Sequence, residues 1–157
     1  QDGSDRKLVV TGCMVQRYGE ELVQELPEVD LFIGIDDEIR ILELLDGLKS
    51  GSRCIVTHPS RFVVSSTLPR RLSTPFFRSY LKITEGCDNR CTYCMIPSIR
   101  GRLRSRPIDD LVTEAHALDR SGVRELTLIA QDLTAYGDDL DAGDNLVALL
   151  QALLAAT

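Results

Sequence analysis

Apolar and polar positions along the first 46 residues follow a pattern that predicts strands and helices in turn. Short apolar runs predict strands at "KLVVTG" and "LFIGI", and amphipathic stretches predict helices at residues 15–26 and in "DDEIRILELLDG". This βαβα order is typical of parallel strands covered by helices. Gly47 suits the left-handed residue that ends the second helix.

The next stretch, residues 48–78, shows no sustained repeat of apolar positions that would predict a helix or a long strand. Ser, Arg and Pro are mixed there with scattered apolar residues. This composition predicts an interdomain connector with one short strand at Arg61–Ser65.

A second βαβα series begins at Tyr80. A strand is expected in "YLKIT", a helix from Pro107, a buried parallel strand in "RELTLIA" and a last helix in "DNLVALLQALLAAT". Pro107 suits the start of its helix, and Gly122 suits the left-handed position just beyond its end. Two such βα units are too few to close a barrel.

Length and composition predict a globular protein of one ordinary domain or two small ones. The chain has 157 residues, of which 43% are hydrophobic, enough to build a core. The longest apolar stretches fall short of the roughly 20 residues of a membrane span. The chain opens with neither a methionine nor a signal pattern, so we expect a cytoplasmic protein, no membrane partner, and a piece of a longer chain.

The net charge of −6 is unevenly distributed. Residues 47–106 contain twelve Lys and Arg but only two acidic residues, Glu85 and Asp88. Two interpretations stay open: a solvated Arg-rich connector, or a face that meets an anionic partner such as nucleic acid or a nucleoprotein.

Three of the five cysteines form a CxxxCxxC array in "TEGCDNRCTYCMIP". A structural zinc site needs a fourth ligand, for which only His58 and His116 offer an imidazole. A ferredoxin-like carrier also needs a fourth cysteine, and its local spacing is CxxCxxC. The remaining alternative is a four-iron cluster held by three thiolates, whose fourth iron is free to bind a substrate or cofactor.

The segment "GCDNRCTYCMIP" resembles the signature of radical S-adenosylmethionine enzymes, in which the array follows the first strand of a TIM-like barrel. The resemblance implies that Cys87, Cys91 and Cys94 hold a 4Fe-4S cluster whose free iron binds S-adenosylmethionine. It also implies that Tyr93 lies beside the adenine. The alternative for Tyr93 is packing alone.

Further segments narrow the resemblance to methylthiotransferases. "VVTGCMVQRYGEELVQELPEVDLFIG" is similar to the end of their amino-terminal domain, and "IPSIRGRLRSRP" to the segment after their cysteine array. The resemblance implies that Cys13 is the third of three cysteines that bind a second 4Fe-4S cluster, whose other two cysteines this chain lacks. Cys54 matches no ligand position.

The fold class implied is α/β. Residues 1–47 are expected to be the C-terminal part of a Rossmann-like methylthiotransferase domain, residues 48–78 a connector, and residues 79–157 the first βα units of a radical S-adenosylmethionine barrel. The fragment is expected to have no turnover by itself.

Within this family, "IPSIRG" and "LIAQDLTAYG" are closer to the RimO branch, which methylthiolates the β-carbon of an aspartate in a small-subunit ribosomal protein. The second alternative is the MiaB branch, which acts on an adenosine of the tRNA anticodon loop and tends to have Asn at the position of Asp132. Radical S-adenosylmethionine enzymes commonly have a Gly-Gly-Glu-like turn at the end of the second strand, which receives the methionine amino group, and this chain departs from that pattern with Ala130, Gln131 and Asp132. Gln131 and Asp132 are therefore expected to contact the cofactor.

The implied partners are the ribosomal protein substrate, an electron donor and a sulfur source, with ribosomal RNA contact left open. A non-catalytic zinc or electron-transfer module is the further alternative. Alternating arginines from Arg100 to Arg106 are expected to point to one side, with Arg102 and Arg104 in water. Glu114 is expected to be a solvated carboxylate.

Overall fold

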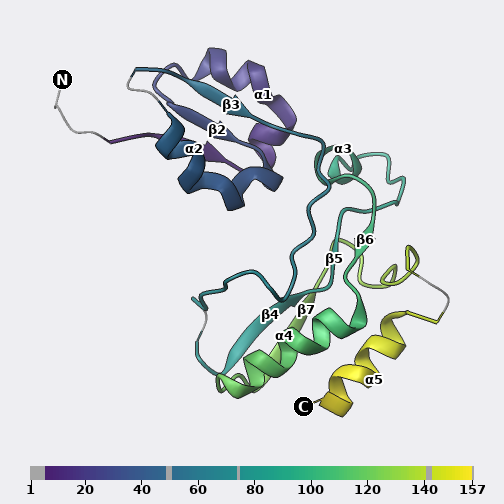
Figure 1. Ribbon diagram of the computed structural model, residues 1–157. Coiled ribbons are helices and arrows are strands. Elements are labelled where there is room, and N and C mark those ends of the chain that lie inside the picture. Colours follow the sequence, from purple (N-terminus) through teal and green to yellow (C-terminus); the bar gives the residue numbers. More distant parts are fainter. Residues whose placement is uncertain (1–5, 49–50, 74, 141–142, 157) are drawn as a thin grey trace. The chain divides into compact units, whose positions relative to one another are not determined.

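The computed structural model describes residues 6–48, 51–73, 75–140 and 143–156 (Figure 1). They form two compact units. Unit 1 comprises the chain up to Arg61 together with Tyr93–Gly101, and unit 2 comprises Phe62–Thr92 and the chain from Arg102 onward. The domain limits expected from the sequence stay a prediction. No helix in the described ranges is long and apolar enough to cross a membrane.

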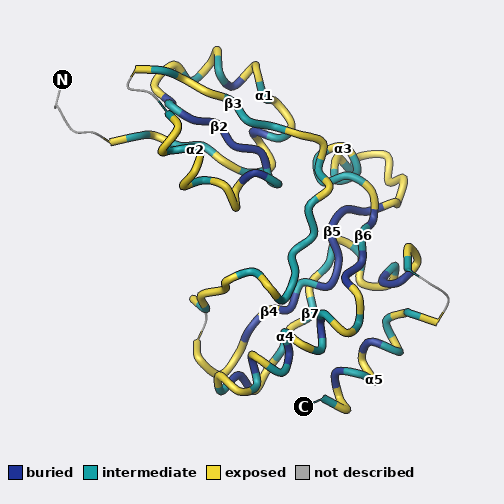
Figure 2. The backbone as a smooth tube through the Cα atoms, viewed as in Figure 1, coloured by how far each residue is buried: buried dark blue, intermediate teal, exposed yellow. Residues whose placement is uncertain are grey.

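Unit 1 contains a parallel three-stranded sheet of β1 (Val9–Thr11), β2 (Leu31–Ile33) and β3 (Cys54–Val56), in that order. All three residues of β2 are buried, as Figure 2 shows in dark blue. A central parallel strand buried on both faces is normally apolar throughout. The expected parallel strands are confirmed, whereas β3 forms within the predicted connector, at a position other than the one short strand expected there.

Helices of unit 1 are α1 (Cys13–Glu25), the 3-10 helix η1 (Ile35–Arg40), α2 (Ile41–Gly47) and α3 (Ile96–Arg100). Gly19 interrupts α1 with a φ of 36°, a conformation that glycine adopts without steric cost. The expected second helix is divided into η1 and α2. The prediction for Gly47 is wrong, because Gly47 is the last helical residue and does not have a positive φ.

The core of unit 1 lies between α1 and the sheet. Val15 and Leu22 of α1 pack there with Val29 and Phe32. Arg53, just before β3, donates hydrogen bonds to three backbone carbonyls at and beyond the end of α1, those of Val23, Leu26 and Val29. These bonds satisfy carbonyls that have no partner within the helix.

Unit 2 contains two pairs of strands. β4 (Arg78–Lys82) and β7 (Glu125–Ile129) are parallel, and β5 (Thr84–Glu85) and β6 (Arg104–Ser105) are antiparallel. The expected burial of the second parallel strand is wrong: alternate residues of β7 are exposed, since β7 pairs with β4 alone among the described strands. The strand expected at Arg61–Ser65 is also wrong, because those residues have no regular structure.

Two helices complete unit 2, α4 (Ile108–Arg120) and α5 (Leu146–Ala156). Pro107 immediately precedes α4, and Gly122 follows it with a φ of 97°, as expected. The core contains residues of both helices, of the β4–β5 region and of the loop after β7: Leu81, Ile83, Leu111, Ala115, Tyr136, Leu149 and Leu153.

Candidate functional site

The cysteine array lies in the loop that follows β5, as the sequence predicted. Gly86 begins the loop with a φ of 70°, which favours glycine. Cys87 is buried, Cys91 is exposed and Cys94 is half-buried, and none of the three forms a disulfide. Three free thiols on one loop are a donor set suited to iron or zinc.

The boundary between the two units falls inside the array, after Thr92. Cys87 and Cys91 therefore belong to unit 2, and Cys94 belongs to unit 1. Among the described residues, no three Cys, His, Asp or Glu side chains are grouped as a ready-made metal site. His58, a candidate fourth ligand, instead contacts the Asp37 carboxylate through Nδ1 at 2.8 Å.

Asp88 and Asn89, between the first two cysteines, bond to neighbouring segments of unit 2. The Asp88 carboxylate accepts hydrogen bonds from the Leu103 backbone N–H at 2.9 Å and from the Arg102 guanidinium at 2.8 Å. These bonds lower the pKa of Asp88, the guanidinium contributing more than the backbone. Asn89 donates to Asp132 Oδ2 at 2.7 Å. Sequence reasoning did not predict either contact, although both residues lie inside the motif.

Asp132 follows the end of β7, where the chain turns. Its Oδ1 accepts hydrogen bonds from the Thr134 backbone N–H at 3.0 Å and from the Thr134 hydroxyl at 2.7 Å. The Thr134 hydroxyl, followed by the Asn89 amide, lowers the pKa of Asp132. The carboxylate is therefore charged at neutral pH and ties the turn after β7 to the cysteine loop. Gln131 beside it is exposed.

The last third of the array belongs to unit 1. Tyr93 is 88% exposed, so its ring is not packed as a core aromatic. The Ile96 N–H, at the start of α3, lies 3.5 Å from Cys94 Sγ. Hydrogen bonds to the sulfurs are one of the features that set the properties of a bound iron–sulfur cluster.

Cys13 is also in unit 1, at the first position of α1 and after the carboxyl end of β1. Its side chain is exposed, and Arg100 Nη2 of α3 lies 3.5 Å from its sulfur. Gly12 precedes it with a φ of 105°. Cys54 is exposed in β3 and forms no disulfide.

The four alternating arginines do not share one side, so that prediction is wrong. Arg100 belongs to α3, and Arg102 is 88% exposed but pairs with Asp88. Arg104 donates to the Arg102 carbonyl at 2.7 Å. Only Arg104–Ser105 form a strand, so the extended run needed for alternation is absent from this stretch.

Arg106 is almost completely buried, with 1% of its side chain exposed. The sequence pattern placed it among the alternating arginines and did not predict its role in the interior of unit 2. Arg106 pairs with Asp110 at 2.6 Å and with Glu114 at 2.7 Å, and it donates to the Lys82 carbonyl. Glu114 also pairs with Arg70. The prediction of a solvated Glu114 is therefore wrong. The signal for this cluster was the spacing of Asp110 and Glu114, which places both carboxylates on one face of α4, just after Arg106.

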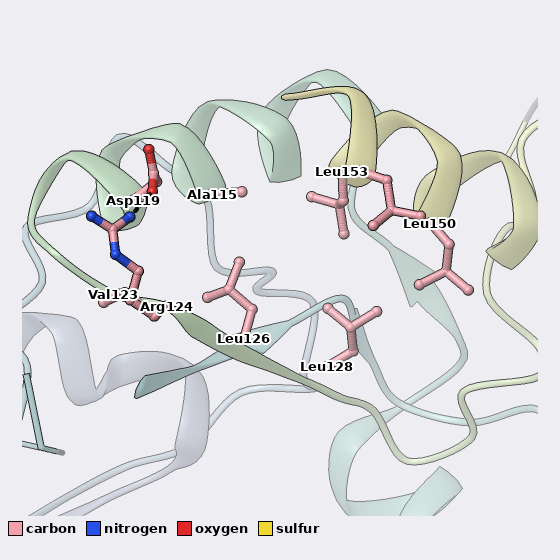
Figure 3. A pocket seen from close by; sticks show the side chains of 9 residues that line it. Ala115, Asp119, Val123, Arg124, Leu126, Leu128, Leu150 and Leu153 are labelled. Carbon is pink, nitrogen blue, oxygen red and sulfur yellow. Dashed lines mark hydrogen bonds and ion pairs between the residues drawn. The ribbon is translucent and has the colours of Figure 1, made fainter. Parts of the chain in front are cut away.

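Unit 2 has two cavities of interest, and only the smaller one lies at the cysteine loop. It has a volume of about 180 Å³ and is lined by residues of the array, of the loop after β7 and of the segment before β6, including Cys87, Asp88, Asn89, Leu103 and Asp139. The larger cavity, about 390 Å³, lies between α4, β7 and α5 (Figure 3). Its walls are mainly leucine, with the Arg124–Asp119 ion pair at one end, and contain no cysteine.

Comparison with known proteins supports the family that the cysteine motif indicates. Residues 81–154 match the family model of the radical SAM superfamily. The chain is 55% identical over 157 residues to a protein of Desulfotalea psychrophila named ribosomal protein uS12 methylthiotransferase RimO. Proteins with the same name from Syntrophus aciditrophicus and Myxococcus xanthus are 53% and 50% identical.

These matches cover nearly all of this chain but only part of each relative. They include 99%, 96% and 98% of the chain, and 35%, 34% and 32% of the respective relatives. The chain thus spans about a third of the length of the curated relatives it matches. Radical SAM proteins use an iron–sulfur cluster and S-adenosylmethionine, and the free thiols of the loop fit such a cluster.

Proposed function

Because the chain belongs to the RimO family of radical SAM methylthiotransferases, we propose that the protein containing it adds a methylthio group to ribosomal protein uS12. The target is the β-carbon of an aspartate. The observation that carries the proposal is the CxxxCxxC array in the loop after a strand, together with identity near 50% to uS12-modifying relatives over almost the whole chain.

Cys87, Cys91 and Cys94 hold a 4Fe-4S cluster through three thiolates in this proposal. Their freedom from disulfides and their placement on one loop support the assignment. With S-adenosylmethionine bound, the cluster supplies the radical chemistry that an unactivated C–H bond requires. Cys87 is buried and lines the small cavity, so this cavity lies directly beside one of the three thiols.

Tyr93, Gln131 and Asp132 contact S-adenosylmethionine in the same proposal. The exposed Tyr93 ring is able to stack on the adenine. Gln131 has an exposed amide that donates and accepts hydrogen bonds. Asp132 is charged and attracts the methionine amino group, while its bonds to Asn89 and Thr134 fix its orientation.

Cys13 is proposed as one ligand of a second 4Fe-4S cluster. Its exposed thiol at the first position of α1, just after the carboxyl end of β1, supports this role, because the sulfur is accessible to a cluster. Two clusters, one for radical chemistry and one for sulfur, agree with the addition of both sulfur and methyl.

The proposal extends to the organisation and partners of the protein. Residues 1–47 are part of the domain that carries the second cluster, residues 48–78 connect it, and residues 79–157 begin the barrel. The partners are uS12, an electron donor and a sulfur source in the cytoplasm. Exposed basic residues between positions 47 and 106, such as Arg71 and Arg90, support a ribosomal RNA contact.

The function is tested by expressing the full-length protein that contains this chain in a bacterium whose own uS12 methylthiotransferase gene is deleted. Mass spectrometry of uS12 and of tRNA then gives the substrate. We expect the methylthio mass on the uS12 aspartate and no change in tRNA. Modification of tRNA alone would assign the protein to the tRNA branch.

Two cysteine variants serve as matched probes. Cys91 and Cys54 are both exposed free thiols, but only Cys91 lies in the array. We expect Cys91→Ser to abolish uS12 modification and Cys54→Ser to leave it unchanged. Equal activity of both variants would contradict the assignment of the cluster.

A further inference from the structure

We propose that Asp88 is a positioning residue that holds the first half of the cysteine loop in the shape that accepts the cluster. The inference rests on the proposed function. Asp88 acts on the loop through a hydrogen bond that its carboxylate accepts from the backbone N–H of Leu103. Its partner segment, Arg102–Leu103, immediately precedes β6.

The bond extends a short antiparallel pair. β5 and β6 are joined at two positions, Thr84 with Ser105 and Glu85 with Arg104. The loop then leaves β5 through Gly86, and backbone pairing ends. Two residues later, the Asp88 carboxylate takes the place of the next backbone partner by accepting the Leu103 N–H at 2.9 Å.

The position of Cys87 follows from this geometry. Cys87 lies between the last backbone pair and the Asp88 side-chain bond, so both of its flanks are fixed. Its burial, with 8% exposed, agrees with such a fixed position. Leu103, whose N–H makes the bond, is also buried, with 7% exposed. A bond from a buried N–H is more costly to lose than one from an exposed group.

The loop has a second attachment on the next residue. The Asn89 amide reaches Asp132 after β7, so that consecutive side chains of the array bond to two different segments. The residues that follow, Arg90 and Cys91, are exposed. Asp88 and Asn89 thus anchor the beginning of the loop to the 102–103 segment and to the turn after β7.

The ion pair between Asp88 and Arg102 is the lesser part of the contact. The Arg102 side chain is 88% exposed and that of Asp88 is 42% exposed. Water and salt screen such a pair, which contributes little. Variants that remove only the ion pair should therefore have smaller effects than variants that also remove the backbone bond.

Three variants in the full-length protein separate these contributions. Asp88→Ala removes the bond to Leu103 and the ion pair. Asp88→Asn removes the charge but keeps an oxygen that accepts the Leu103 N–H. Arg102→Met removes only the guanidinium. The first measurement is the hydrogen exchange rate of the Leu103 amide in the protein without cluster, with the amides of α4 as the folding control.

We expect Asp88→Ala to raise the exchange rate of the Leu103 amide about tenfold, and Arg102→Met to change it less than about threefold. After anaerobic reconstitution, iron per chain is expected to fall in Asp88→Ala and to be largely restored in Asp88→Asn. The inference is overturned if Asp88→Ala changes neither quantity, if it changes the exchange rate but not the iron content, or if Arg102→Met equals it.

These readouts do not depend on the substrate. An Asp88→Ala protein that loses iron, in an enzyme whose wild type never modifies uS12, would contradict the proposed function and support the positioning role. A wild type that modifies uS12, with an Asp88→Ala variant that binds iron normally, would overturn the positioning role alone.

Discussion

Replacement of Arg106 by Met tests the account of unit 2 because it removes a buried charge while keeping most of the side-chain volume. Arg106 is 1% exposed and bonds to the Asp110 carboxylate, the Glu114 carboxylate and the Lys82 carbonyl. Arg106→Met leaves all three acceptors without this donor. The variant should therefore unfold more readily than the wild type.

The expected loss follows from how well the two carboxylates are shielded. Removing one partner of a buried ion pair typically costs about 3–5 kcal/mol. Here Asp110 and Glu114 are 20% and 12% exposed, and each keeps another partner, the Ser66 N–H and Arg70 respectively. We therefore expect the lower end of the range, about 3 kcal/mol.

Native-state hydrogen exchange measures this loss locally. A change of about 3 kcal/mol corresponds to an increase of about a hundredfold in the exchange rates of the Leu111 and Ala115 amides of α4. The control is Arg102→Met, which breaks an exposed Arg–Asp pair and should cost less than about 1 kcal/mol. Equal effects of the two variants, or a loss below about 1 kcal/mol for Arg106→Met, would refute the reasoning.

Three further predictions concern single residues. Gly137→Ala should lower the unfolding free energy by more than about 2 kcal/mol in urea titrations, because φ is 92° and a Cβ would overlap the Asp144 backbone. Burial, with repulsion from Asp144, raises the pKa of Tyr136 to about 12. The folded state therefore favours the neutral Tyr136 phenol, and the stability gained in this way should be complete below about pH 10 and disappear as the pH rises through about 12. Tyr136→Phe should remove this pH dependence of the unfolding free energy. Arg53→Met should cost about 1–3 kcal/mol in unit 1, measured by exchange of the α1 amides, since three carbonyls lose their donor.

Local signals in the sequence predicted the elements that have strong local causes. Pro107 and Gly122 delimit α4 because proline suits a helix start and glycine the left-handed residue beyond its end. The loop position of the cysteines followed in the same way from the strand before them. Each of these features depends on residues close together in the sequence.

Features that depend on distant partners were missed or wrong. β3 has three residues, too few for a periodic pattern, and forms because β2 lies beside it. The burial of Arg106 depends on two carboxylates of α4 and on the carbonyl of Lys82 in β4. A buried arginine is rare without such partners, so its surroundings decide its burial more than its neighbours in the sequence.

Anaerobic reconstitution of the chain with iron and sulfide tests the central claim most directly. The account predicts about four irons bound by Cys87, Cys91 and Cys94, and an electron paramagnetic resonance spectrum of the reduced cluster that changes when S-adenosylmethionine is added. Stoichiometric zinc in place of iron, or a four-iron spectrum that the cofactor leaves unchanged, would contradict it.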